Sequence, residues 1–145
     1  MRLNNKLLSL LFVSFFIAYY PVWKNLVGVW ANNENYSHGF AIVPLSLFIL
    51  WRQRSELTNA AEANTGQRKG LLFAIFALII YILALAGGIQ TLSSLSMIFF
   101  LAGTILYLWG SQVLRITAFP LMLLALMIPV PSQLLAAMTI PLQLL

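Results

Sequence analysis

The chain has 145 residues, of which 61% are hydrophobic and 8% are charged, whereas an average soluble domain has about 25% charged residues. This composition excludes an ordinary water-soluble domain and indicates an all-α, polytopic transmembrane helix bundle that forms a single domain over residues 1–145. The net charge of +5 does not indicate a nucleic-acid partner, because the basic residues are few and flank apolar runs, where they orient helices in a membrane.

Five apolar runs are predicted to cross the membrane, at residues 7–23, 39–51, 71–86, 92–109 and 116–128. The second run reaches full length only if it begins near Tyr36. A signal peptide is the alternative interpretation of the first run. However, the run is longer than the apolar core of a signal peptide, and no A-x-A cleavage pattern follows it. We therefore interpret it as an uncleaved first helix.

The segments between these runs differ in polarity. Residues 25–38 are predicted to form a loop whose apolar patch lies in the membrane interface, and residues 52–70 a hydrophilic cytoplasmic loop. Residues 132–145 are predicted to form a short helix on the outer side, with Ser132 as its N-cap. The sequence stops on apolar residues, so we expect a chain that is missing its continuation.

The distribution of basic residues predicts the orientation. With the N-terminus in the cytoplasm, seven Lys and Arg residues fall inside and only Lys24 falls outside, as the positive-inside rule requires. We therefore predict a multi-pass protein of a bacterial inner (plasma) membrane. Residues 34–40 and Pro129 would then lie on the outer side.

The one polar stretch between long apolar runs is Glu34-Asn35-Tyr36-Ser37-His38-Gly39-Phe40, which holds the only His. An imidazole can act as an acid, a base or a metal ligand, with Glu34 as a partner one helical turn earlier. Zinc sites take three or four protein ligands, so we predict no metal and no cofactor. A serine hydrolase is disfavoured, because adjacent Ser37 and His38 side chains diverge and the chain has no Asp. A direct chemical role and a structural role both stay open for His38.

A second polar group lies at the start of the fourth run: Gln90, Thr91, Ser93, Ser94 and Ser96. These side chains either line a cavity with His38 or pack polar groups between helices, and we favour the second interpretation. The middles of the runs contain no Asp, Glu or Lys, which counts against a half-transporter. Arg115 is interpreted as a topology charge at the cytoplasmic edge.

Two regions resemble the exosortase/archaeosortase family. The first runs from Trp30 to Arg54 and contains Tyr36-Ser37-His38-Gly39-Phe40, Pro44-Leu45 and the closing Leu50-Trp51-Arg52-x-Arg54. The second runs from Arg115-x-x-x-Phe119-Pro120 to Ile128-Pro129-Val130-Pro131 and Pro141-Leu142-Gln143. The positions that match the family pattern are Tyr36, Ser37, His38, Gly39, Pro44, Trp51, Arg115, Pro120, Pro129 and Pro131.

The resemblance implies a membrane cysteine peptidase or transpeptidase that processes C-terminal Pro-Glu-Pro sorting signals of exported proteins, linked to exopolysaccharide production. The sequence has no Cys, so the family's nucleophile has no counterpart here. The resemblance therefore implies the N-terminal half of an exosortase, inactive alone, with His38 as a supporting residue. Its implied partners are membrane lipids, a C-terminal exosortase half and exported proteins that carry a sorting signal. The alternative is a non-enzymatic membrane scaffold or assembly subunit for polysaccharide or protein export.

Overall fold

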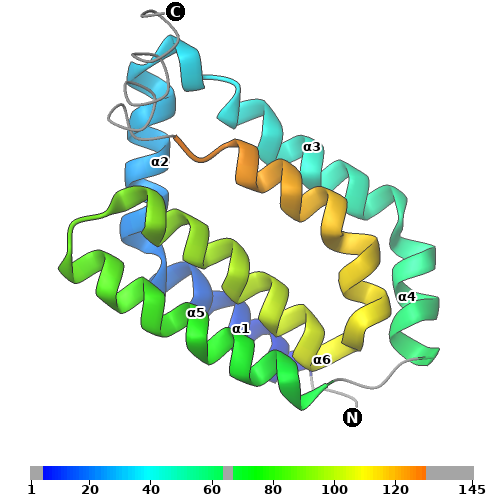
Figure 1. Ribbon diagram of the computed structural model, residues 1–145. Helices are drawn as coiled ribbons and strands as arrows, with labels where there is room; N and C mark the ends of the chain where they lie inside the picture. Colours follow the sequence, from blue (N-terminus) through cyan, green and yellow to red (C-terminus); the bar gives the residue numbers. More distant parts are fainter. Residues whose placement is uncertain (1–4, 64–66, 130–145) are drawn as a thin grey trace, which may run out of the picture.

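A computed structural model describes residues 5–63 and 67–129, and over these residues the chain is helical with no strand (Figure 1). This confirms the predicted all-α class. The elements are α1 (Asn5–Ala18), α2 (Tyr20–Asn32), the 3₁₀ turn η1 (Glu34–Tyr36), α3 (Gly39–Arg52), α4 (Arg54–Ala63), α5 (Arg68–Ala86) and α6 (Gln90–Leu126). The predicted helix at 132–145 lies outside the described residues.

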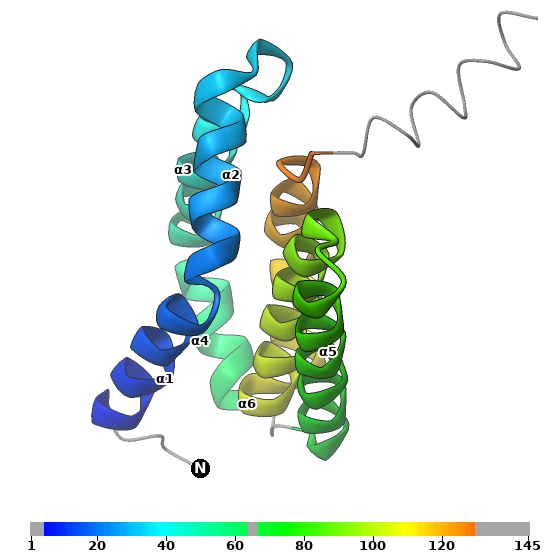
Figure 2. The ribbon, with the colours of Figure 1, turned by 90° about the vertical axis from the view of Figure 1, so that its left-hand side faces the viewer.

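The chain reverses its direction at two opposite ends of the bundle, as both ribbon views show (Figures 1 and 2). One end, which we call the His38 end, contains η1, the turn between α5 and α6, and the last residues of α6. The other, which we call the basic end, contains α4, the start of α5 and the bend within α6. It carries Arg52, Arg54, Arg68, Lys69 and Arg115.

Length and hydropathy support fewer membrane spans than the five predicted. Helices α5 and α6 are long and apolar enough to cross a membrane, and α1 with α2 adds a third span if this pair, bent by 61°, counts as one. Helix α3 has 14 residues, which reach about 21 Å, whereas the hydrocarbon core is about 30 Å thick. The structure thus supports two or three spans by this criterion.

The prediction for residues 7–38 was wrong at two points. The first helix does not run to residue 23, because α1 ends at Ala18 and α2 begins at Tyr20 with Pro21 in its first turn. Proline has no N–H and clashes with the preceding turn, which explains the break. The Tyr81 hydroxyl donates a hydrogen bond of 2.6 Å to the carbonyl of Ala18 at this break. The predicted loop at 25–38 is helical up to Asn32.

The hydrophilic segment 52–70 also contains a helix, since α4 covers Arg54–Ala63. The predicted fourth and fifth runs are the two arms of α6, which are separated by Gly110 with φ 84° and ψ −174°. A residue with a side chain rarely adopts this positive φ, so glycine fits the break. Gln67 joins the break to α5, because its N–H donates to the carbonyl of Leu106 and its side-chain amide to Ser111 Oγ, at 3.1 and 3.3 Å.

Helices α5 and α6 approach closely along a row of small residues. The buried side of α5 contains Gly70, Ala74, Ala77 and Ala84, together with Tyr81. A Cβ at Gly103 of α6 would lie 2.7 Å from the main-chain N and 2.9 Å from the Cα of Ala74. The two backbones are therefore in contact, as is common between membrane helices.

We expect Gly103→Val to destabilise the bundle, because the added side chain must push the Ala74 backbone away; such overpacking costs about 1–3 kcal/mol. The measurement is the thermal unfolding midpoint in detergent. The matched control is Gly28→Val, since a Cβ at Gly28 meets nothing within 4 Å. If both variants lowered the unfolding midpoint equally, the close contact between Gly103 and Ala74 would be contradicted.

Candidate functional site

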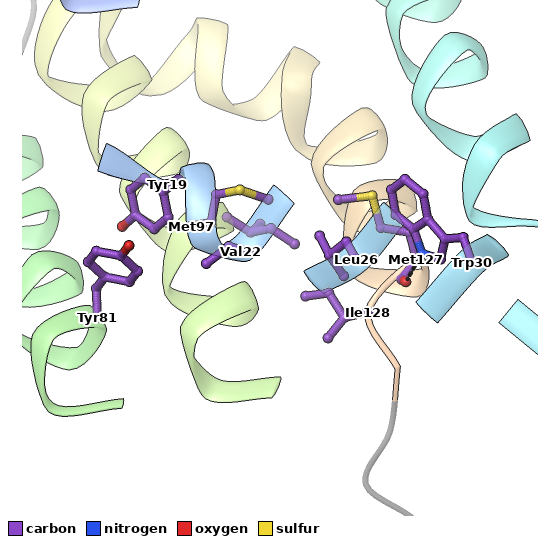
Figure 3. Close-up of a cluster of buried hydrophobic side chains, with 9 residues drawn as sticks. Tyr19, Val22, Leu26, Trp30, Tyr81, Met97, Met127 and Ile128 are labelled. Atoms are coloured by element: carbon purple, nitrogen blue, oxygen red, sulfur yellow. Dashed lines mark hydrogen bonds between the residues drawn. The ribbon is translucent and has the colours of Figure 1, made fainter. Parts of the chain in front are cut away.

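A buried cluster runs along α2 from Tyr19 to Trp30, and Trp30 lies at one end of it beside Met127 (Figure 3). Val22, Leu26 and Trp30 recur every four residues and are buried, so one face of α2 packs inward. The Trp30 side chain is 4% exposed, and its Nε1–H donates a hydrogen bond of 3.2 Å to the carbonyl of Met127. This bond joins positions 97 residues apart and satisfies a carbonyl at the end of α6.

Gly39 lies directly under the Trp30 ring. A Cβ at this position would overlap Nε1, Cε2 and Cδ1 of the indole, so any larger residue would displace the ring. The next residue, Phe40, meets the same indole edge to face with ring centroids 5.3 Å apart. The Tyr-Ser-His-Gly motif is thereby attached through Trp30 to the end of α6.

The remaining motif residues form an exposed rim above this contact. Asn33 caps η1 by accepting a bond of 3.1 Å from the N–H of Asn35, and the Ser37 hydroxyl donates to the carbonyl of Glu34 at 2.8 Å. The His38 side chain is exposed at the start of α3, with its ring centroid 6.3 Å from that of Tyr36. The imidazole is therefore open to a molecule that approaches this end.

The polar residues at the start of α6 are packed among helices. Ser93, Ser94 and Ser96 are buried, and their hydroxyls donate to carbonyls of their own helix at 2.7–3.1 Å. This agrees with the interpretation that these serines pack between helices. Thr91 differs, because its hydroxyl donates to the carbonyl of Pro129 at 3.1 Å. Trp30 and Thr91 thus bind successive parts of the segment 127–129.

The structure brings together only part of the predicted set. Gly39 and Pro129 lie at the His38 end with Tyr36, Ser37 and His38, whereas Trp51 and Arg115 lie at the basic end (Figures 1 and 2). The Arg54 guanidinium lies 4.7 Å from the centre of the Trp51 ring, and Arg115 is exposed.

The two helix prolines and the last motif residue complete this set. Pro44 lies exposed within α3, and Pro120 lies buried within α6. Pro131 lies outside the described residues.

The chemistry available at the rim is limited to that of an exposed imidazole. Ser37 directs its hydroxyl to a main-chain carbonyl, whereas a serine nucleophile needs its proton directed to a base. Within residues 5–63 and 67–129, no group of three His, Cys, Asp or Glu residues could hold a metal ion. The described rim can therefore orient a bound group, or exchange a proton with it through His38.

Comparison with known proteins identifies the family. The profile described as transmembrane exosortase (Exosortase_EpsH) matches residues 30–145, which is most of the chain. The chain belongs to the transmembrane exosortase family. With its apolar helices, this makes it an integral membrane protein. No curated protein and no solved structure gave a significant match.

The exosortase match begins at Trp30, the residue that connects the motif to the end of α6. Trp30 begins the region that resembles the exosortase family, but it was predicted to lie in the loop at 25–38, and no contact with the end of α6 was predicted for it. The signal was the recurrence of Val22, Leu26 and Trp30 at intervals of four, which is typical of a helix face. The bond from Thr91 to Pro129 had no comparable signal in the sequence, because it depends on how the two arms of α6 fold back.

We expect Trp30→Phe to destabilise the His38 end, because it leaves the buried carbonyl of Met127 without its donor; an unsatisfied buried group costs about 1–3 kcal/mol. The unfolding midpoint in detergent measures this effect. Trp51→Phe is the matched control, since Trp51 is 62% exposed. If Trp30→Phe and Trp51→Phe lower the unfolding midpoint equally, the hydrogen bond does not stabilise the bundle.

Proposed function

We propose that these residues form the substrate-facing front part of an exosortase that processes C-terminal Pro-Glu-Pro sorting signals of exported proteins. In this proposal the His38 end receives the exported chain. The hydrolase or transpeptidase chemistry is a thiolate attack on the peptide carbonyl, and the sequence has no Cys to supply it. The nucleophile would therefore come from a Cys-bearing C-terminal exosortase half, either in the same assembly or in a longer chain.

The observation that carries this proposal is the junction of Trp30, Gly39 and Met127. It attaches the exposed residues Ser37 and His38 to the end of α6 through one buried hydrogen bond and one ring contact. A site that acts on a flexible exported chain needs its polar groups held in place, and this junction supplies a rigid base for the rim. His38 would position the substrate or exchange a proton with it.

We further propose that the His38 end faces the periplasm and that the N-terminus lies in the cytoplasm of a bacterial inner membrane. The basic residues support this orientation, because five of those described lie at the opposite end. The reversals of the chain at the two ends of the bundle support five membrane passes. These are α1 with α2, then α3, then α5, and then the two arms of α6. Short helices such as α3 are tolerated where the bilayer thins locally.

The second candidate is a membrane scaffold for polysaccharide or protein export. The observation that favours it is the small number of reactive groups at the rim. The described part of the chain offers one imidazole and no group of residues that could bind a metal ion. This candidate requires a partner but no reaction. It predicts that His38 can be replaced without effect.

The proposed activity is tested by coexpressing the chain with an exosortase C-terminal half that carries the Cys and a reporter with a Pro-Glu-Pro tail. We expect the pair to process the reporter and the single chain to leave it uncut. His38→Ala should lower the processing rate about tenfold or more, as expected for loss of an acid or base. The matched control is Asn35→Ala, an exposed change on the same rim.

Two results would contradict the proposal in different ways. A folded, copurifying pair that leaves the reporter uncut would exclude the enzymatic function. Normal processing by His38→Ala would leave the enzyme but remove the role of His38.

The orientation is tested separately by fusing a reporter after Ala63, at the end of α4. We expect the reporter to be cytoplasmic, because α4 lies at the basic end. A fusion after Asn35 at the His38 end should report from the periplasm. Reversed signals would place His38 on the cytoplasmic side and overturn the proposed topology.

A further inference from the structure

Two open grooves follow one another along the outside of the bent pair α1 and α2. The first, of about 630 Å³, lies on α2 and is lined by Pro21, Lys24, Asn25, Gly28 and Asn32, among others. These positions recur every three to four residues and lie on a different face from the buried residues of α2. Four of the groove's seven lining residues are polar, Lys24, Asn25, Asn32 and Asn33, and Val29 and Pro21 add apolar surface between them.

The polar groove has one positive charge and no carboxylate among its lining residues. Lys24 and Asn32 are exposed, and Asn25 is half-buried. Gly28 leaves the groove open, since a Cβ there would meet nothing within 4 Å. Asn32 is fixed at one wall by a hydrogen bond of 2.7 Å from its Nδ2 to the carbonyl of Gly28. The groove thus combines donors and a cation, which suits an anion.

The second groove, of about 590 Å³, lies on α1 and its junction with α2, and its lining is apolar: Phe12, Val13, Phe16, Ile17 and Tyr20. All five side chains are exposed, and Ile17 is 70% exposed. The two grooves are continuous in sequence, because Tyr20 lines the apolar groove and Pro21 lines the polar one. The bend between α1 and α2 lies at this junction.

We propose that the α1–α2 bend binds an anionic phospholipid, with its phosphate in the polar groove beside Lys24 and an acyl chain in the apolar groove. The order of the two grooves matches the order of a head group and a hydrocarbon chain.

A lipid fits both grooves better than an extended peptide does. An extended peptide in the apolar groove would leave main-chain polar groups in hydrocarbon without partners, whereas an acyl chain has none to satisfy. An exposed lysine with two asparagines on a membrane helix also needs a polar partner, because such residues are costly when they face lipid tails alone. A phosphate beside Lys24 supplies that partner.

The test is native mass spectrometry of the full chain released from vesicles of equal phosphatidylglycerol and phosphatidylcholine. We expect phosphatidylglycerol to be retained about fivefold over phosphatidylcholine, the preference that one lysine near a charged surface gives. Lys24→Gln should abolish this preference and Lys24→Arg should keep it. Gly28→Leu should reduce retention because its side chain fills the polar groove.

Lys69→Gln is the matched control, because Lys69 is an exposed lysine at the basic end. Loss of the preference in Lys69→Gln as well would mean a general charge effect and would overturn the site. Equal retention of both lipids by the unchanged chain would also overturn it.

Deacylated glycerophosphoglycerol at millimolar concentration tests the apolar groove, and we expect it not to displace the lipid. Displacement would show that the phosphate alone is bound. A protein held at the groove in place of the lipid would show a protein interface, and either result would overturn the proposal.

Discussion

The indole of Trp30 donates its N–H to the carbonyl of Met127, and the arrangement of the His38 end depends on this contact. Val22 and Leu26 also pack inward from α2, and Trp30 adds a polar bond to this apolar contact. The buried face places Trp30 where its ring covers Gly39 and its nitrogen reaches α6. Met127 is fully buried, so no water competes with the indole for its carbonyl.

Close approach through glycine is the second constraint on the bundle. At one end Gly39 admits the Trp30 ring, and at the other Gly70 and Gly103 admit a neighbouring backbone. The large apolar residues of α5, such as Leu72, Phe76 and Ile82, are exposed instead. In a soluble protein the small residues would be exposed and the large apolar ones buried. The opposite distribution is expected in a membrane, because lipid tails are as apolar as these side chains and no hydrophobic effect drives them inward.

The sequence predicted the helical class, the runs at 71–86 and 92–109, and the exosortase family. It failed at 7–38, where hydropathy was read as one span and a loop although Pro21 marks a break and Trp30 belongs to a helix face. The junction of Trp30, Gly39 and Met127 could not be predicted, because it needs the relative placement of α2 and α6. Hydropathy reports how apolar a segment is and not which face meets which neighbour.

The left-handed conformation of Gly110 has a consequence for how the chain enters a membrane. Without it, residues 90–126 would emerge from the ribosome as one apolar rod of about 55 Å, far longer than a bilayer core. The break, with Arg115 shortly after it, divides this rod into two arms, and the second arm returns toward the His38 end (Figure 1). The break at Gly110 thus allows Pro129 to lie beside Thr91, whose hydroxyl donates to its carbonyl.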